Sequence, residues 1–117
     1  MTTNTDQLNR QRVQIDTLDS QLLRLLNQRA QVAREVASIK RSSGLPVYDP
    51  QRERTILDRV CDLNPGPLDS QSVTAIFRCI IQESRRIQES SVQLAQGNPF
   101  QREDRNGDQY DSERIRS

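Results

Sequence analysis

Residues 8–41 read LNRQRVQIDTLDSQLLRLLNQRAQVAREVASIKR, and this stretch contains neither glycine nor proline. Within it, hydrophobic side chains recur at spacings of three, four and seven residues, the repeat of one face of a helix. They are Leu8, Ile15, Leu18, Leu22, Leu25, Val32, Val36 and Ile39. The pattern predicts one helix of about 35 residues, or about 50 Å. A helix of that length normally packs along another long helix.

Two shorter helices are predicted after this stretch. Asp49 and Pro50 suit the N-cap and the first position of one helix, which a Pro-Gly-Pro turn at residues 65–67 ends. Asp69 or Ser70 caps the next, whose hydrophobic pattern is lost after Leu94. We therefore expect an all-α fold of a long, a short and a medium helix, forming one domain over residues 1–95. Residues 96–117 are polar and are predicted to be a disordered tail.

The composition narrows the class of protein. Only 32% of the 117 residues are hydrophobic and 3% aromatic, which is little for a compact monomer, so we expect chains to associate. The net charge of +1, with both signs interspersed, predicts no nucleic-acid or membrane partner. No signal peptide or membrane span is expected. Cys61 and Cys79 are interpreted as free thiols of a reducing, cytoplasmic compartment. With no histidine and no metal-ligand spacing, we expect no metal or cofactor.

Five polar residues fall on the hydrophobic faces of these helices. Arg29 lies in the hydrophobic seam of the first helix, and Lys40 follows it by close to three turns on the same face. Glu53 precedes the hydrophobic residues of the second helix by one turn. Ser84 and Gln88 are i, i+4 neighbours on the third. A buried cation destabilises the fold unless an opposite charge lies nearby. Together these residues could bind a small molecule that carries carboxylates and hydroxyls.

Each of the five also has a purely structural interpretation. Arg29 and Glu53 could form a buried ion pair. Lys40 could complement the dipole at the end of its helix. Ser84 and Gln88 could bond to each other or to a backbone carbonyl. A single ligand site explains all five residues at once, whereas the structural interpretation needs a separate reason for each.

Arg12 lies seventeen residues before Arg29, which is about 25 Å along a helix. Within one chain the two arginines therefore cannot both contact one small ligand. Two antiparallel long helices from two chains could bring Arg12 of one beside Arg29 of the other, and the alternative is that Arg12 is an exposed surface residue. Asp49 is explained by capping, and Arg52 could be a solvated residue of a first turn.

Three stretches of the sequence resemble the all-helical chorismate mutases, in the form of the small bacterial domain. They are RVQIDTLDSQLLRLLNQRAQVAREVASIK (12–40), PVYDPQRE (46–53) and IFRCIIQESRRIQ (76–88). The resemblance implies the rearrangement of chorismate to prephenate, on the path to phenylalanine and tyrosine. It also implies a homodimer in which the helices of two chains intertwine and pack as a helical bundle.

The resemblance assigns roles to individual residues. Lys40 and Gln88 are the implied catalytic donors to the ether oxygen of chorismate. Arg29 and Lys40, with Arg12 from the partner chain, hold its carboxylates, and Glu53 receives the ring hydroxyl. The implied substrate-binding residues are Arg12, Arg29, Lys40, Asp49, Arg52, Glu53, Ser84 and Gln88.

Two other functions compete with this interpretation. An isochorismate pyruvate lyase of the same fold shares the cations and the glutamine, but by resemblance lacks the pair formed here by Arg52 and Glu53, so that pair favours the mutase. A non-catalytic helical dimerisation module would fit the long first helix. The function of such a module would not explain why Arg29, Glu53 and Gln88 lie on the hydrophobic faces of their helices.

Overall fold

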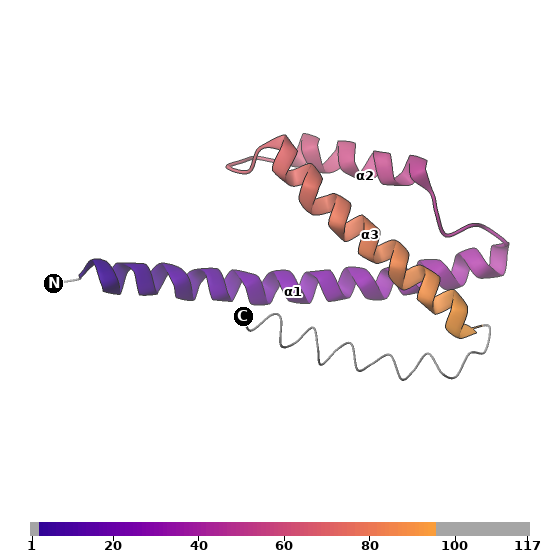
Figure 1. Cartoon of the computed structure of the whole chain (residues 1–117), viewed down its shortest axis with the longest axis horizontal. Helices are drawn as coiled ribbons and strands as arrows, with labels where there is room; N and C mark the ends of the chain where they lie inside the picture. The colour runs from indigo at the N-terminus through magenta and orange to yellow at the C-terminus, as the bar shows by residue number, and fades with distance from the viewer. Residues whose placement is uncertain (1–2, 96–117) are drawn as a thin grey trace.

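The computed structural model describes the backbone of residues 3–95 and the side chains of residues 3–90. The predicted polar tail, residues 96–117, lies outside the described residues. The helices are α1 (Asn4–Ser43), α2 (Pro50–Leu63) and α3 (Ser70–Ala95), and the described residues include no strand (Figure 1). The prediction of an all-α fold with a long, a short and a medium helix is confirmed.

α1 is longer than the hydrophobic pattern predicts, because a polar cap sets its start and a glycine sets its end. The Thr3 hydroxyl accepts a hydrogen bond from the Asp6 backbone N–H at 3.0 Å, and the Asp6 carboxylate accepts one from the Thr3 N–H at 3.4 Å. This reciprocal capping box starts the helix at Asn4, ahead of Leu8. At the other end Gly44 has a φ of 70°, a left-handed conformation that favours glycine and ends the helix.

Aspartates start the two shorter helices where the sequence predicts them. The Asp49 carboxylate accepts from the Arg52 N–H at 3.0 Å, and Pro50 takes the first helical position. The Asp69 carboxylate accepts from the Ser72 N–H at 2.8 Å. Hydrogen bonds from Ser72 lower the pKa of the Asp69 carboxyl. Of the two predicted caps for α3, Asp69 is therefore the one used.

α3 packs against both other helices and so holds the fold together (Figure 1). The buried hydrophobic residues among those described are Ala33 and Ala37 on α1, and Val73 and Ile81 on α3. Alanines on α1 allow the α3 backbone to approach closely. This small core lies along the C-terminal half of α1, the half that also carries Arg29 and Lys40, whereas Arg12 lies in the other half.

The N-terminal half of α1 extends beyond the other two helices (Figure 1). Its hydrophobic side chains are 49–63% exposed; they are Leu8, Val13, Ile15, Leu18, Leu22, Leu23 and Leu25. The radius of gyration is 18.4 Å, against about 13 Å for a compact chain of this size. Leu8, Ile15, Leu18, Leu22 and Leu25 share one face of the helix, and an exposed hydrophobic face is typical of an interaction surface. None of the described helices combines the length and hydrophobicity needed to cross a membrane.

Candidate active site

A cavity of about 300 Å³ lies where the C-terminal half of α1, the start of α2 and the middle of α3 meet. Val32 and Val36 of α1 and Ile81 of α3 contribute to its hydrophobic wall. Its polar lining comes from all three helices and consists of Arg29, Lys40, Asp49, Arg52, Glu53, Ser84, Arg85 and Gln88. A small volume with hydrophobic walls and a few converging polar groups is typical of a small-molecule site.

Seven of the eight predicted substrate-binding residues line this cavity, and Arg12 does not. Arg12 lies on the extended half of α1, about 25 Å from Arg29 along the helix axis. Within one chain, Arg12 and Arg29 are therefore too far apart to contact one small ligand. The cavity as formed by a single chain contains no contribution from Arg12.

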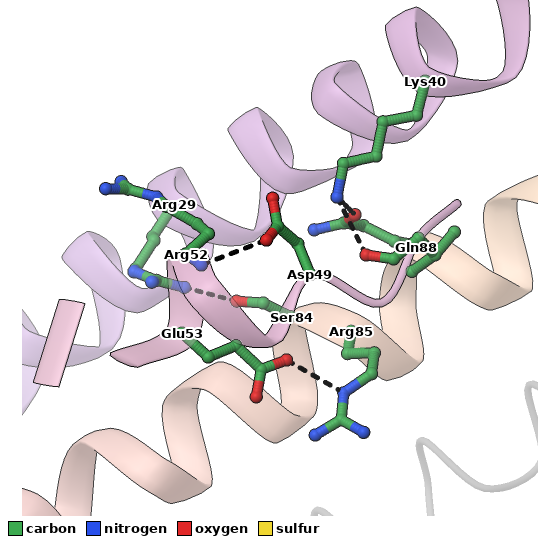
Figure 2. Close-up of polar contacts among 9 residues, drawn as sticks. Arg29, Lys40, Asp49, Arg52, Glu53, Ser84, Arg85 and Gln88 are labelled. Atoms are coloured by element: carbon green, nitrogen blue, oxygen red, sulfur yellow. Dashed lines mark hydrogen bonds and ion pairs between the residues drawn. The ribbon is translucent and has the colours of Figure 1, made fainter. Parts of the chain in front are cut away.

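Lys40 and Gln88 both line the cavity and are joined by a hydrogen bond (Figure 2). The Lys40 ammonium donates to the backbone carbonyl of Val47 at 2.8 Å and to Gln88 Oε1 at 3.3 Å. An ammonium has three N–H groups, so one remains for a ligand. Because Oε1 of Gln88 accepts from Lys40, the amide NH₂ group is also left to donate. Lys40 lies in the last turn of α1, so it complements the helix dipole as well.

Arg29 donates a hydrogen bond from its guanidinium to Ser84 Oγ (Figure 2). Burial lowers the pKa of Arg29, and the nearby charge of Arg52 lowers it further. Within the described part of the chain no carboxylate forms an ion pair with Arg29. The structural alternative in which Arg29 pairs with Glu53 is therefore wrong. A partly buried guanidinium beside a second cation instead favours an anionic ligand.

Glu53 is paired with Arg85, a residue that the sequence analysis did not include. Arg85 Nε lies 3.3 Å from Glu53 Oε2, and the Arg85 guanidinium stacks on the Tyr48 ring, 4.8 Å from its centroid. A signal was available in the sequence. Arg85 follows Ile81 by one helical turn of four residues, so it belongs to the same face of α3.

The charges of the cavity do not balance. Its lining carries four cations (Arg29, Lys40, Arg52 and Arg85) and two carboxylates (Asp49 and Glu53). One carboxylate caps α2 and the other is paired with Arg85. The formal excess of two positive charges suits a small dianion. No cluster of three or more potential metal ligands is found in the part of the chain that the structure describes.

Comparison with known proteins identifies the family of this chain. The chain matches the family described as chorismate mutase type II over residues 11–89. It is 46% identical over 69 residues to a bifunctional chorismate mutase/prephenate dehydratase of Neisseria gonorrhoeae, a match that covers 59% of this chain and 18% of that protein. It is 33% identical over 86 residues to a chorismate mutase of Methanocaldococcus jannaschii, covering 73% and 87% of the two chains. The chain thus spans about a fifth of the bifunctional relatives it matches.

Solved structures show the same fold. A chorismate mutase of Thermus thermophilus superposes with a TM-score of 0.70 at 30% identity, covering 71% of this chain and 94% of that chain. A chorismate mutase of Helicobacter pylori, crystallised in complex with prephenate, superposes with a TM-score of 0.68 at 32% identity. That match covers 74% of this chain and 93% of the other.

Proposed function

This chain belongs to the chorismate mutase type II family, and from that premise we propose that it converts chorismate to prephenate, in the biosynthesis of phenylalanine and tyrosine. The observation that carries the proposal is the cavity lined by Arg29, Lys40 and Gln88, with its excess of two positive charges. Chorismate is a dianion. Its rearrangement is pericyclic and involves no proton transfer and no covalent intermediate. The reaction therefore needs no general acid or base, and a chain without histidine can catalyse it.

The proposed catalytic groups are Lys40 and Gln88. As the C–O bond of chorismate breaks, partial negative charge develops on the ether oxygen. Donors fixed near that oxygen stabilise the transition state more than the ground state, and that difference accelerates the reaction. Hydrogen bonds of Lys40 to Val47 at 2.8 Å and to Gln88 at 3.3 Å orient the remaining N–H of Lys40 and the amide NH₂ of Gln88. Little reorganisation is then needed during the reaction.

The proposed substrate clamp needs two chains. Arg29 can hold one carboxylate of chorismate in a bidentate contact, and we assign the second guanidinium to Arg12 of the partner subunit. The two contacts would hold the enolpyruvyl arm over the ring, so that the reacting carbons start close together. A homodimer in which the extended halves of two α1 helices pack together would also bury their leucines, which are 49–59% exposed in the single chain. Burial of a fully exposed leucine stabilises a protein by about 1.5–3 kcal/mol, so each would contribute about half of that.

Two further expectations accompany this assignment. The catalytic domain is proposed to comprise residues 1–95, because α1, α2 with its N-cap Asp49, and α3 contribute the whole polar lining of the cavity. A cytoplasmic location is proposed because it would keep Cys61 and Cys79, which are free thiols in this structure, in the reduced state.

The purified protein is expected to accelerate the loss of chorismate by at least about 10⁶-fold over the uncatalysed reaction. The decrease in chorismate absorbance measures the rate, and prephenate should form in equal amount. A parallel assay with isochorismate should release no pyruvate, because Arg52 and Glu53 both line the cavity. Release of pyruvate without loss of chorismate would contradict the proposal in favour of the lyase.

Mixing two inactive variants tests the shared site. Arg12→Ala and Lys40→Ala homodimers each lack one essential group in both sites. In a heterodimer one site combines an intact Lys40 with the partner subunit's Arg12, and the other site lacks both. If subunits exchange at random, half of the dimers are heterodimers with one working site of two, so about a quarter of wild-type activity should return.

The control for this experiment is a demonstration that subunits exchange, by mass spectrometry of isotopically labelled chains. If Arg12 acts within its own chain, no heterodimer has an intact site. Absence of recovery after proven exchange would therefore place Arg12 outside the partner's cavity.

A further inference from the structure

We propose that Arg85 is a positioning residue that orients the Glu53 carboxylate toward a hydroxyl group of the ligand. The inference rests on the proposed function, in which Glu53 receives the ring hydroxyl of chorismate. Arg85 lines the cavity but is not among the residues to which the family resemblance assigns a role. Its contacts with Glu53 and Tyr48 carry the argument.

Glu53 needs an external group to hold its carboxylate in one orientation. Its side chain projects from the first turn of α2 into a cavity that is also lined by Arg29 and Arg52. Both of these cations attract the Glu53 carboxylate. Arg85 Nε lies 3.3 Å from one carboxylate oxygen, Oε2 (Figure 2). The two side chains are only 23% (Glu53) and 35% (Arg85) exposed, so solvent screens this attraction less than on an open surface. With Oε2 beside Arg85, Oε1 is left for a ligand hydroxyl.

Arg85 is itself held from a second side. Its guanidinium stacks over the Tyr48 ring at 4.8 Å, and Tyr48 directly precedes Asp49, the N-cap of α2. The planar guanidinium can stack on the ring and face the carboxylate at once, which an ammonium does less well. Arg85 therefore connects α3 to the start of α2, the turn from which Glu53 projects.

Stability alone does not explain this contact well. Arg85 Nε is buried, yet its N–H has no hydrogen-bond acceptor within the described residues, although Oε2 is close. The pair is thus held by charge and not by an aligned hydrogen bond. A buried donor without an acceptor destabilises a fold. Holding the carboxylate, while leaving its lone pairs available to a ligand, accounts for the arrangement.

A double-mutant cycle tests this role through kcat and KM for chorismate in four proteins: wild type, Arg85→Met, Glu53→Gln and the double variant. Arg85→Met should lower kcat/KM by about tenfold, because an unfixed carboxylate meets the hydroxyl less often. In the Glu53→Gln background the same substitution should lower kcat/KM by less than about twofold, because the neutral amide has no charge for Arg85 to hold. Arg85→Lys should retain more activity than Arg85→Met, since the charge remains.

Arg86→Met is the matched control. Arg86 forms an ion pair with Glu83 at 2.7 Å on the exposed face of α3, and its loss should leave kcat and KM unchanged. If Arg85→Met lowers kcat/KM by the same factor in both backgrounds, or does not lower it at all, the positioning role is refuted while the mutase function stands. If wild type does not turn over chorismate, the proposed function falls and this role with it. Should Arg85→Met fail to fold by circular dichroism, Arg85→Gln, which also removes the charge, completes the cycle in both backgrounds.

Discussion

Replacing Lys40 with arginine is expected to lower kcat by more than tenfold, on the order of 10²-fold, although the positive charge is conserved. The Lys40 ammonium makes two hydrogen bonds, to the Val47 carbonyl at 2.8 Å and to Gln88 Oε1 at 3.3 Å. Its third N–H is the one proposed to meet the ether oxygen. A guanidinium is planar and longer, so it cannot direct donors to all three acceptors from the same backbone position.

Steady-state rates at saturating chorismate measure this effect, and circular dichroism shows whether the variant folds. Arg41→Lys is the matched control, because Arg41 is the next residue of the same helical turn and is exposed. That variant should turn over chorismate at the wild-type rate. A Lys40→Arg protein with near-normal kcat would remove Lys40 from the mechanism.

Gln88→Glu is expected to make the activity depend on pH. A carboxyl group donates to the ether oxygen only when protonated, and an unperturbed glutamic acid has a pKa of about 4.3. At pH 7 only about one molecule in 500 would then be protonated, so kcat should fall by about 500-fold. The rate should rise as the pH is lowered, because protonation both restores the donor and removes a negative charge that repels the substrate.

The wild-type amide does not titrate, so it should show no such rise towards acid pH. Gln82→Glu adds the same charge to an exposed position of α3, and its pH–rate profile should match that of the wild type. A flat profile for Gln88→Glu between pH 4 and 8 would count against the assignment of Gln88 as a donor.

The sequence was sufficient to predict the three helices, because the signals that start and end them are local. The Asp49 and Asp69 caps each act within three residues, and Gly44 stops α1 through its own backbone conformation. Only the start of α1 was missed: Thr3 and Asp6 form the capping box, whereas the prediction relied on the first hydrophobic residue, Leu8.

The sequence also determined which polar side chains face inward, because helical periodicity assigns a residue to a face without knowledge of its neighbours. That is why Arg29, Lys40, Glu53, Ser84 and Gln88 could be selected together, and all five line the cavity. Arg85 lies on the same face of α3 as Ile81 but was not selected, because surface arginines are common in a chain with so many arginines.

Only the tertiary structure decided which of these groups meet. Arg29 and Ser84 are 55 residues apart in the chain, and Lys40 and Gln88 are 48 apart, so the crossing of α3 over α1 sets both pairs. The sequence allowed Glu53 to pair with Arg29, and the fold paired it with Arg85. Periodicity gives each helix a direction in which its side chains point. The distance and angle between helices come from packing, on Ala33, Ala37, Val73 and Ile81, and these determine which donor reaches which acceptor.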